Sequence, residues 1–191
     1  MNPVHKTLRA GTAEAHERVD AAFAAFDLTD RDSYAAFLRA HAEVLLPLEE
    51  ALPGERIVPD WEGRKRGALL REDLAFLRHP GESRDLLPQS TQPVARDPGL
   101  RRDDEWDEAA IAGTLYVLEG SRLGGRFLAR QLPPGFPRAY LDADQPPENW
   151  RNLLARLGTI LYQPAQLQSA LVAARNVFSA FEQSANRWAK G

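Results

Sequence analysis

A helical pattern of apolar residues extends from residue 104 to residue 131 and contains three glycines, Gly120, Gly124 and Gly125. Each glycine inside a helix costs roughly 0.5–1 kcal/mol relative to alanine, so a compensating interaction is expected. Gly120 and Gly124 lie on one helical face, with Gly125 one step round. A face without side chains lets the backbone approach a broad surface. Two explanations remain open, namely a flat ligand, or close helix packing with a break in the helix at the glycine pair.

The rest of the chain follows the same helical period. Its apolar residues recur at helical rather than alternating spacing, and no hairpin dipeptide separates two alternating runs. The pattern predicts further helices over residues 8–23, 34–48, 60–77, 148–157 and 164–189, with loops over 82–103 and 133–147. We therefore predict an all-α fold, and the length of 191 residues fits a single domain over 1–191.

Composition excludes several classes of site and partner. The chain has no cysteine, which removes disulfides, thiol nucleophiles and iron–sulfur clusters. A net charge of -3 provides no basic field for nucleic acid. No stretch of about 20 apolar residues is present to span a membrane, and the N-terminus lacks the apolar region of a secretory signal. The sequence thus predicts a cytoplasmic protein without nucleic-acid or membrane partners.

His16 is the histidine most suited to bind a metal. It shares a helical face with Thr12, Ala15 and Val19, so we expect it to point inward with little bulk beside it. A neutral imidazole in such a place is a candidate axial ligand, and a hydrogen-bonded core histidine is the alternative.

The remaining histidines and the common catalytic and binding motifs give no stronger evidence for a functional site. We expect His5 to be solvated, His41 to be a hydrogen-bonded core residue, and His79 to cap a helix end. No Glu-x-x-His pair supports a di-iron bundle. The glycine segment has phosphate-loop spacing, but Arg126 and Phe127 replace the required Lys-Ser/Thr.

Two segments together resemble haem oxygenases. Residues 8–17 match the first-helix pattern of Leu, a basic residue, Thr and His, and residues 115–128 contain a Glu-Gly-Ser-x-Leu-Gly-Gly core like that of the kinked distal helix. The likeness is greatest to the bacterial branch that supplies biliverdin to bacteriophytochromes. Residues 37–49 and the pattern Trp61-x-x-Arg64-x-Arg66 also resemble that branch, so the similarity covers nearly the whole chain.

The resemblance implies a single compact helical domain with haem between the first helix and the kinked distal helix. His16 would be the proximal iron ligand, and Gly120, Gly124 and Gly125 would be the distal contacts. Animal enzymes of the family have an Asp after the first of these glycines, which organises a distal water. Ser121 stands at that position here, so Arg122 or Arg126 would have to support the water instead.

Other positions are expected to hold the periphery of the haem. Arg9 and Thr12 match the first-helix motif, and Arg9 would bind a propionate. Arg175 lies three residues before Phe178 on the last helix, where the two side chains are candidates for contact with the haem. A solvated helix arginine is the alternative for Arg175.

The activity implied is oxidative opening of haem to biliverdin, CO and ferrous iron. Haem is both substrate and cofactor, O2 is the co-substrate, and electrons come from an external ferredoxin or reductase. A bacteriophytochrome is a possible acceptor of the biliverdin. A haem or tetrapyrrole carrier without turnover is the main alternative. A thiaminase-like enzyme of the same fold would need a cysteine, and a plain helical interaction module would leave His16 and the glycines unexplained.

Overall fold

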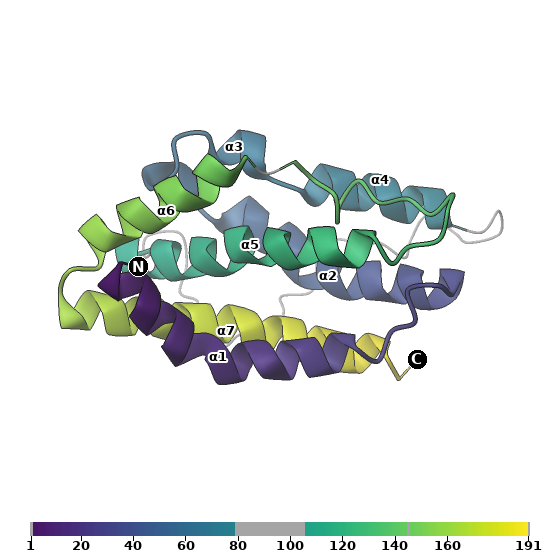
Figure 1. Cartoon of the computed structure of the whole chain (residues 1–191), viewed down its shortest axis with the longest axis horizontal. Coiled ribbons are helices and arrows are strands. Elements are labelled where there is room, and N and C mark those ends of the chain that lie inside the picture. Colours follow the sequence, from purple (N-terminus) through teal and green to yellow (C-terminus); the bar gives the residue numbers. More distant parts are fainter. Residues whose placement is uncertain (1, 79–105, 145, 191) are drawn as a thin grey trace.

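The computed structural model describes residues 2–78, 106–144 and 146–190, and within these ranges all regular structure is helical (Figure 1). His79 and most of the predicted 82–103 loop lie outside the described residues. The elements are α1 (Pro3–Phe23), α2 (Arg31–Ala51), the 3-10 turn η1 (Gly54–Arg56), α3 (Trp61–Arg64), α4 (Gly67–Leu77), α5 (Glu108–Ala129), α6 (Pro147–Ile160) and α7 (Pro164–Trp188).

The C-terminal helix organises the bundle. Three long helices, α1, α2 and α5, all pack along α7, and α4 packs on α2. Figure 1 shows α1 alongside α7 below α5, with α3 and α4 on the opposite side of α5 and α6 at one end. The apolar faces predicted from the helical period meet in one continuous core around α7.

Close helix packing explains Gly113 of α5, a glycine outside the segment that contains Gly120, Gly124 and Gly125. A Cβ atom on Gly113 would collide with the backbone carbonyl of Ala170 on α7. The two helices therefore approach backbone to backbone here, which only glycine permits. This contact fixes α5 against α7 before α5 reaches its glycine-rich half.

The predicted third helix is in fact two helices, α3 and α4. Glu49 of α2 is 5% exposed, and its carboxylate accepts the backbone N–H groups of Arg66 and Gly67, each at 2.8 Å. A carboxylate at this point satisfies donors that a helix start leaves unpaired and complements the helix dipole. The chain can therefore restart a helix at Gly67. The apolar period could not reveal the break, because its cause lies 17 residues upstream.

Candidate functional site

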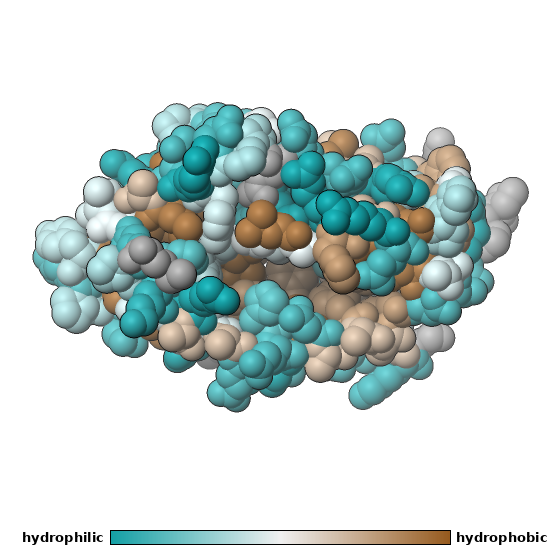
Figure 2. All heavy atoms as spheres, viewed as in Figure 1, coloured by the Kyte–Doolittle hydropathy of each residue, from teal (hydrophilic) through white to brown (hydrophobic). Residues whose placement is uncertain are grey.

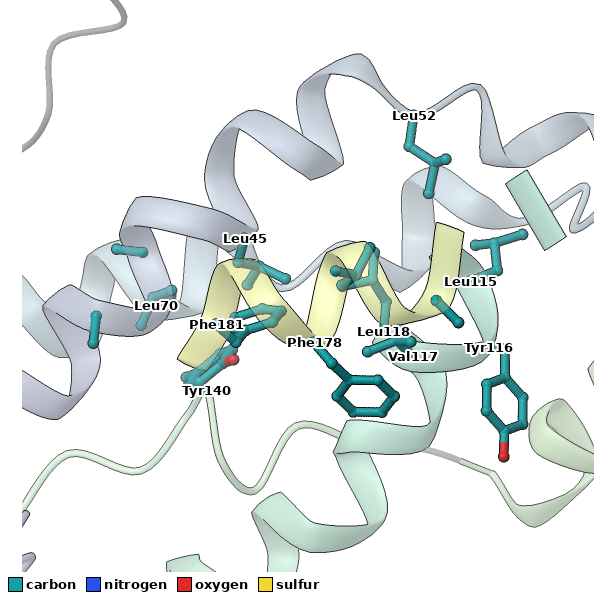
Figure 3. Close-up of a cluster of buried hydrophobic side chains, with 14 of the residues drawn as sticks. Leu45, Leu52, Leu70, Leu115, Tyr116, Val117, Leu118, Tyr140, Phe178 and Phe181 are labelled. Carbon is teal, nitrogen blue, oxygen red and sulfur yellow. The ribbon is translucent and has the colours of Figure 1, made fainter. Parts of the chain in front are cut away.

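An apolar cleft separates α1 from α5. Both helices pack along α7, but they make at most marginal contact with each other. Figure 2 shows the resulting hollow between them, with an apolar interior. Phe178 and Phe181 of α7, each 8% exposed, belong to the buried cluster at this level of the bundle (Figure 3). The cleft has the flat, apolar character of a site for a planar ligand.

His16 stands on the α1 side of the cleft. The sequence predicted a side chain pointing inward, but 59% of the His16 side chain is exposed. Its Nδ1 lies 2.9 Å from Oδ2 of Asp20, and its ring centre is 5.5 Å from that of Phe178. With Nδ1–H donated to a carboxylate, Nε2 keeps its lone pair, as in metal-binding histidines.

The three glycines of α5 meet different surroundings. A Cβ on Gly124 would have no atom within 4 Å, whereas one on Gly120 would lie 3.4 Å from the Trp150 ring. A Cβ on Gly125 would lie 3.0 Å from the backbone oxygen of Leu141. The expectation of one bare face thus describes Gly124 well, while Gly125 is already occupied by packing against a loop.

Tyr116 closes one end of the cleft. It lies four residues before Gly120 on the same side of α5, and its side chain hydrogen-bonds to Thr12 of α1. Burial raises the pKa of the Tyr116 phenol, while this hydrogen bond and the charge of Arg9 act in the opposite direction. Thr12 is 3% exposed and also donates to the Leu8 carbonyl at 2.8 Å, so it ties α1 to α5.

His5 belongs to the same end of the cleft. Its ring centre lies 6.2 Å from that of Tyr116 and 6.0 Å from that of Trp150, both in edge-on arrangements. His5 is therefore half-buried and not fully solvated as the sequence predicted. Burial, followed by the charges of Arg9 and the N-terminus, lowers its pKa and favours a neutral ring.

The two arginines expected at the haem periphery meet the same stretch of α1. Arg9 is exposed on α1 itself, and Arg175 of α7 donates from Nε to the carbonyl of Gly11 at 2.7 Å. The two positive charges therefore lie near one end of the cleft rather than at opposite ends. Such a pair suits the two carboxylates that a haem carries on one edge.

The polar residues after Gly120 are arranged differently from the prediction. Ser121 donates to the carbonyl of Leu118 at 2.8 Å and accepts from Nη2 of Arg66 at 2.9 Å. Arg122 is buried, and its Nε pairs with Glu119 at 3.0 Å. Another of its nitrogens donates to the carbonyl of Arg64, so Arg122 anchors α3 and is not available to a distal water.

Arg66, Tyr140 and His41 form a neighbouring cluster that sequence reasoning did not assign to the site. The Arg66 guanidinium lies 5.0 Å from the centre of the Tyr140 ring, which is 5.5 Å from that of His41. Nδ1 of His41 donates to the Phe37 carbonyl at 2.9 Å, which confirms the predicted hydrogen-bonded core histidine. Burial, opposed by this bond, lowers the pKa of His41 to about 4. The motif from Trp61 to Arg66 includes this arginine, but the sequence alone could not show that the Arg66 side chain contacts Ser121 and Tyr140.

A helical bundle that presents a histidine across an apolar cleft from an uncovered glycine defines a class of protein suited to hold haem. The family model described as Heme oxygenase matches residues 2–187. The chain therefore belongs to the haem oxygenase family, whose activity is the degradation of haem.

Individual relatives agree with this membership. The chain is 35% identical over 161 residues to Heme oxygenase of Xanthomonas campestris, covering 80% of this chain and 88% of that protein. It is 28% identical to Heme oxygenase PigA of Pseudomonas aeruginosa, covering 89% of this chain and 85% of that protein. Heme Oxygenase from Leptospira interrogans has a solved structure with a TM-score of 0.71 and 20% identity, covering 98% of this chain and all (100%) of that one, and it supports the fold. The predicted family and the all-α fold class are thus confirmed.

In the part of the chain that the structure describes, no helix combines the length and apolar character needed to cross a membrane.

Proposed function

We propose that this chain uses O2 and external electrons to open haem to biliverdin, CO and ferrous iron, and that His16 would hold the haem iron. The observation that carries the assignment is the pairing of His16 Nδ1 with Asp20 at 2.9 Å on the edge of the open cleft. That bond orients the ring and leaves Nε2 to bind iron. The uncovered Gly124 on the other side of the cleft fits a flat ring close to the α5 backbone.

The remaining site residues would orient the ring. When bound, haem supplies both the iron that activates O2 and the macrocycle that is oxidised. Phe178 would pack beside the ring next to His16, while Gly120 and Gly124 would leave space above it for a small ligand only. Arg9 and Arg175 would hold the propionates at one end, which fixes the edge presented for attack.

Three predicted residues have roles that would be more indirect. Thr12 would hold α1 to α5 beside the ring rather than bind its edge, because its hydroxyl is already used on the Leu8 carbonyl. Gly125 would contribute through its backbone, since its α-carbon packs against Leu141. Ser121 would act through the arginine that it contacts.

Electrons for the reaction must come from another protein. The chain has no cysteine for an iron–sulfur cluster, so we assign this role to a ferredoxin or a reductase. Release of biliverdin to a bacteriophytochrome and a cytoplasmic location are parts of the same proposal.

A haemin titration of the purified protein, followed by addition of ascorbate in air, tests the proposed function. We expect a sharp Soret band at one equivalent that decays into the broad band of a bilin. A band that persists would favour the haem carrier, and no band at all would overturn haem binding.

The His16→Ala variant tests the ligand in the same titration. Its exposed side chain makes loss of the fold unexpected, so circular dichroism should remain helical while the histidine-ligated spectrum disappears. Glu17→Ala, an exposed position next to His16 on α1, is the matched control and should keep that spectrum. An unchanged spectrum in His16→Ala would contradict the assignment.

A further inference from the structure

The guanidinium of Arg66 is a buried positive charge without a carboxylate partner. The residue is 4% exposed, and its guanidinium donates from Nη2 to the Leu118 carbonyl at 3.1 Å and to Ser121 Oγ at 2.9 Å. Among the ion pairs of the described ranges, none includes Arg66. Glu49 binds only its backbone N–H. The buried Glu49 carboxylate is therefore near enough to offset part of the charge, but the guanidinium donors themselves are directed to neutral acceptors.

The charge lies against the part of α5 that borders the cleft. Ser121, its hydrogen-bond partner, directly follows Gly120, and Gly124 lies three residues further on. Ser121 is itself exposed, so the contact between the two side chains reaches accessible space. Leu118, the other acceptor, is one turn earlier on the same helix.

The guanidinium also lies over an aromatic ring of the buried cluster. The Tyr140 ring lies 5.0 Å beneath it, and the His41 ring lies between Tyr140 and Phe181, at 5.5 and 5.7 Å. Figure 3 shows Tyr140 and Phe181 together, with Phe178 further along the cluster. Phe178 is the ring that touches His16 at 5.5 Å. Phe178 and Phe181 lie one turn apart on α7, and both belong with Tyr140 to the same buried cluster.

The position of Tyr140 is fixed independently of Arg66. Asp73, 2% exposed on α4, accepts the backbone N–H groups of Ala139 and Tyr140 at 3.1 and 2.9 Å. The hydroxyl of Tyr34 also binds this loop at the carbonyl of Pro137, at 2.8 Å. The guanidinium is therefore held from two sides, by the α5 backbone with Ser121 and by an anchored ring.

We propose that Arg66 is the distal positioning residue of this chain, held by Ser121 and supplying positive charge and hydrogen-bond donors to a small ligand bound beneath α5. The inference rests on the proposed haem site. It explains how a serine can follow the first glycine of the segment: Ser121 serves as the acceptor that aims an arginine contributed by the start of α4. It also explains why a guanidinium is retained at a buried position without a carboxylate, since donors with a fixed fork geometry suit a small anion.

Fluoride binding to the ferric haem complex tests this role without any turnover. Fluoride accepts hydrogen bonds, so its affinity and the position of its visible charge-transfer band report distal donors. We expect Arg66→Met to weaken fluoride binding by roughly tenfold or more, because a charge-assisted hydrogen bond is lost. Arg66→Lys should recover part of the affinity, and Ser121→Ala should give a smaller loss than Arg66→Met.

The controls separate positioning from folding and from haem binding. Arg156→Gln removes an exposed arginine of α6 and should leave fluoride affinity unchanged. Melting temperatures of the Met and Lys variants should be alike while their fluoride affinities differ, a pattern that a purely structural arginine would not produce. Equal fluoride affinity in the wild type, Arg66→Met and Arg66→Lys would overturn the inference while leaving the proposed function intact. Failure of the wild type to bind haem would overturn both.

Discussion

The two walls of the cleft are built in different ways. On the α1 wall, His16 and Asp20 lie one turn apart on a single helix, and both side chains are largely exposed. On the α5 wall, Ser121 binds Arg66 at the start of α4, and Arg66 in turn lies over Tyr140 in the loop after α5. The first wall is a local pair that hardly contributes to packing. The second is part of the core, so function and stability are coupled there.

The largest effect on haem affinity is expected when the α5 wall is filled. In Gly124→Leu the new Cβ has no protein atom within 4 Å, so we expect the ligand-free protein to fold normally. Haem affinity should fall roughly a hundredfold, since overpacking a tight site costs about 1–3 kcal/mol. A haemin titration measures the change, with Ala155→Leu on the exposed face of α6 as the matched control. Equal haem affinity in wild type and Gly124→Leu would remove the glycine from the site.

The coupling of the α5 wall to the core should be visible in the pH dependence of stability. Burial lowers the pKa of His41 from 6.5 to about 4 in the folded protein. Below pH 6.5 the unfolded chain therefore binds a proton that the folded protein does not take up until about pH 4, and stability falls across that window. We expect a loss of up to about 3 kcal/mol in the free energy of unfolding.

Urea denaturation of the ligand-free protein at several pH values measures this loss. His41→Phe keeps a ring among Phe23, Phe37 and Phe181 but cannot titrate, so its stability should vary less between pH 6.5 and 4. Parallel pH profiles for wild type and variant would show that His41 is not held neutral by the fold.

The difference between the walls also explains what the sequence could predict. The helices follow from apolar period, and His16 could be singled out because its spacing on α1 and its motif are both local. The hydrogen-bonded state of His41 was likewise predictable from its apolar stripe. The break before Gly67 and the role of Arg66 were not, because they depend on contacts with Glu49 and Ser121 across 17 or more residues. The expectation for Arg122 was wrong for the same reason, because its hydrogen bond to the carbonyl of Arg64 joins residues that are 58 positions apart in the sequence.

A smaller effect is expected when the pair on the α1 wall is weakened. Asp20→Asn keeps an acceptor for His16 Nδ1–H but removes the carboxylate charge of that partner. Haem affinity should fall about tenfold, the lower end for loss of such an outer partner, because both groups are exposed. Glu14→Gln, which weakens an exposed ion pair with Arg18 on the same helix, should leave the titration unchanged. An effect of equal size in both variants would indicate general electrostatics and not a specific pairing.

The smallest effect distinguishes a glycine kept for a ligand from one kept for packing. Gly124→Ala should stabilise the ligand-free protein by about 0.5–1 kcal/mol, because alanine restricts the unfolded chain and its Cβ has free space. Gly125→Ala should gain nothing, since its Cβ would press against the Leu141 oxygen at 3.0 Å. Urea denaturation measures both changes. Gly124→Ala could gain stability and lose haem affinity together. In that case the fold does not require Gly124, and haem binding explains why the chain keeps a residue that lowers the stability of the helix. A loss of stability in Gly124→Ala would instead make it a packing residue like Gly113.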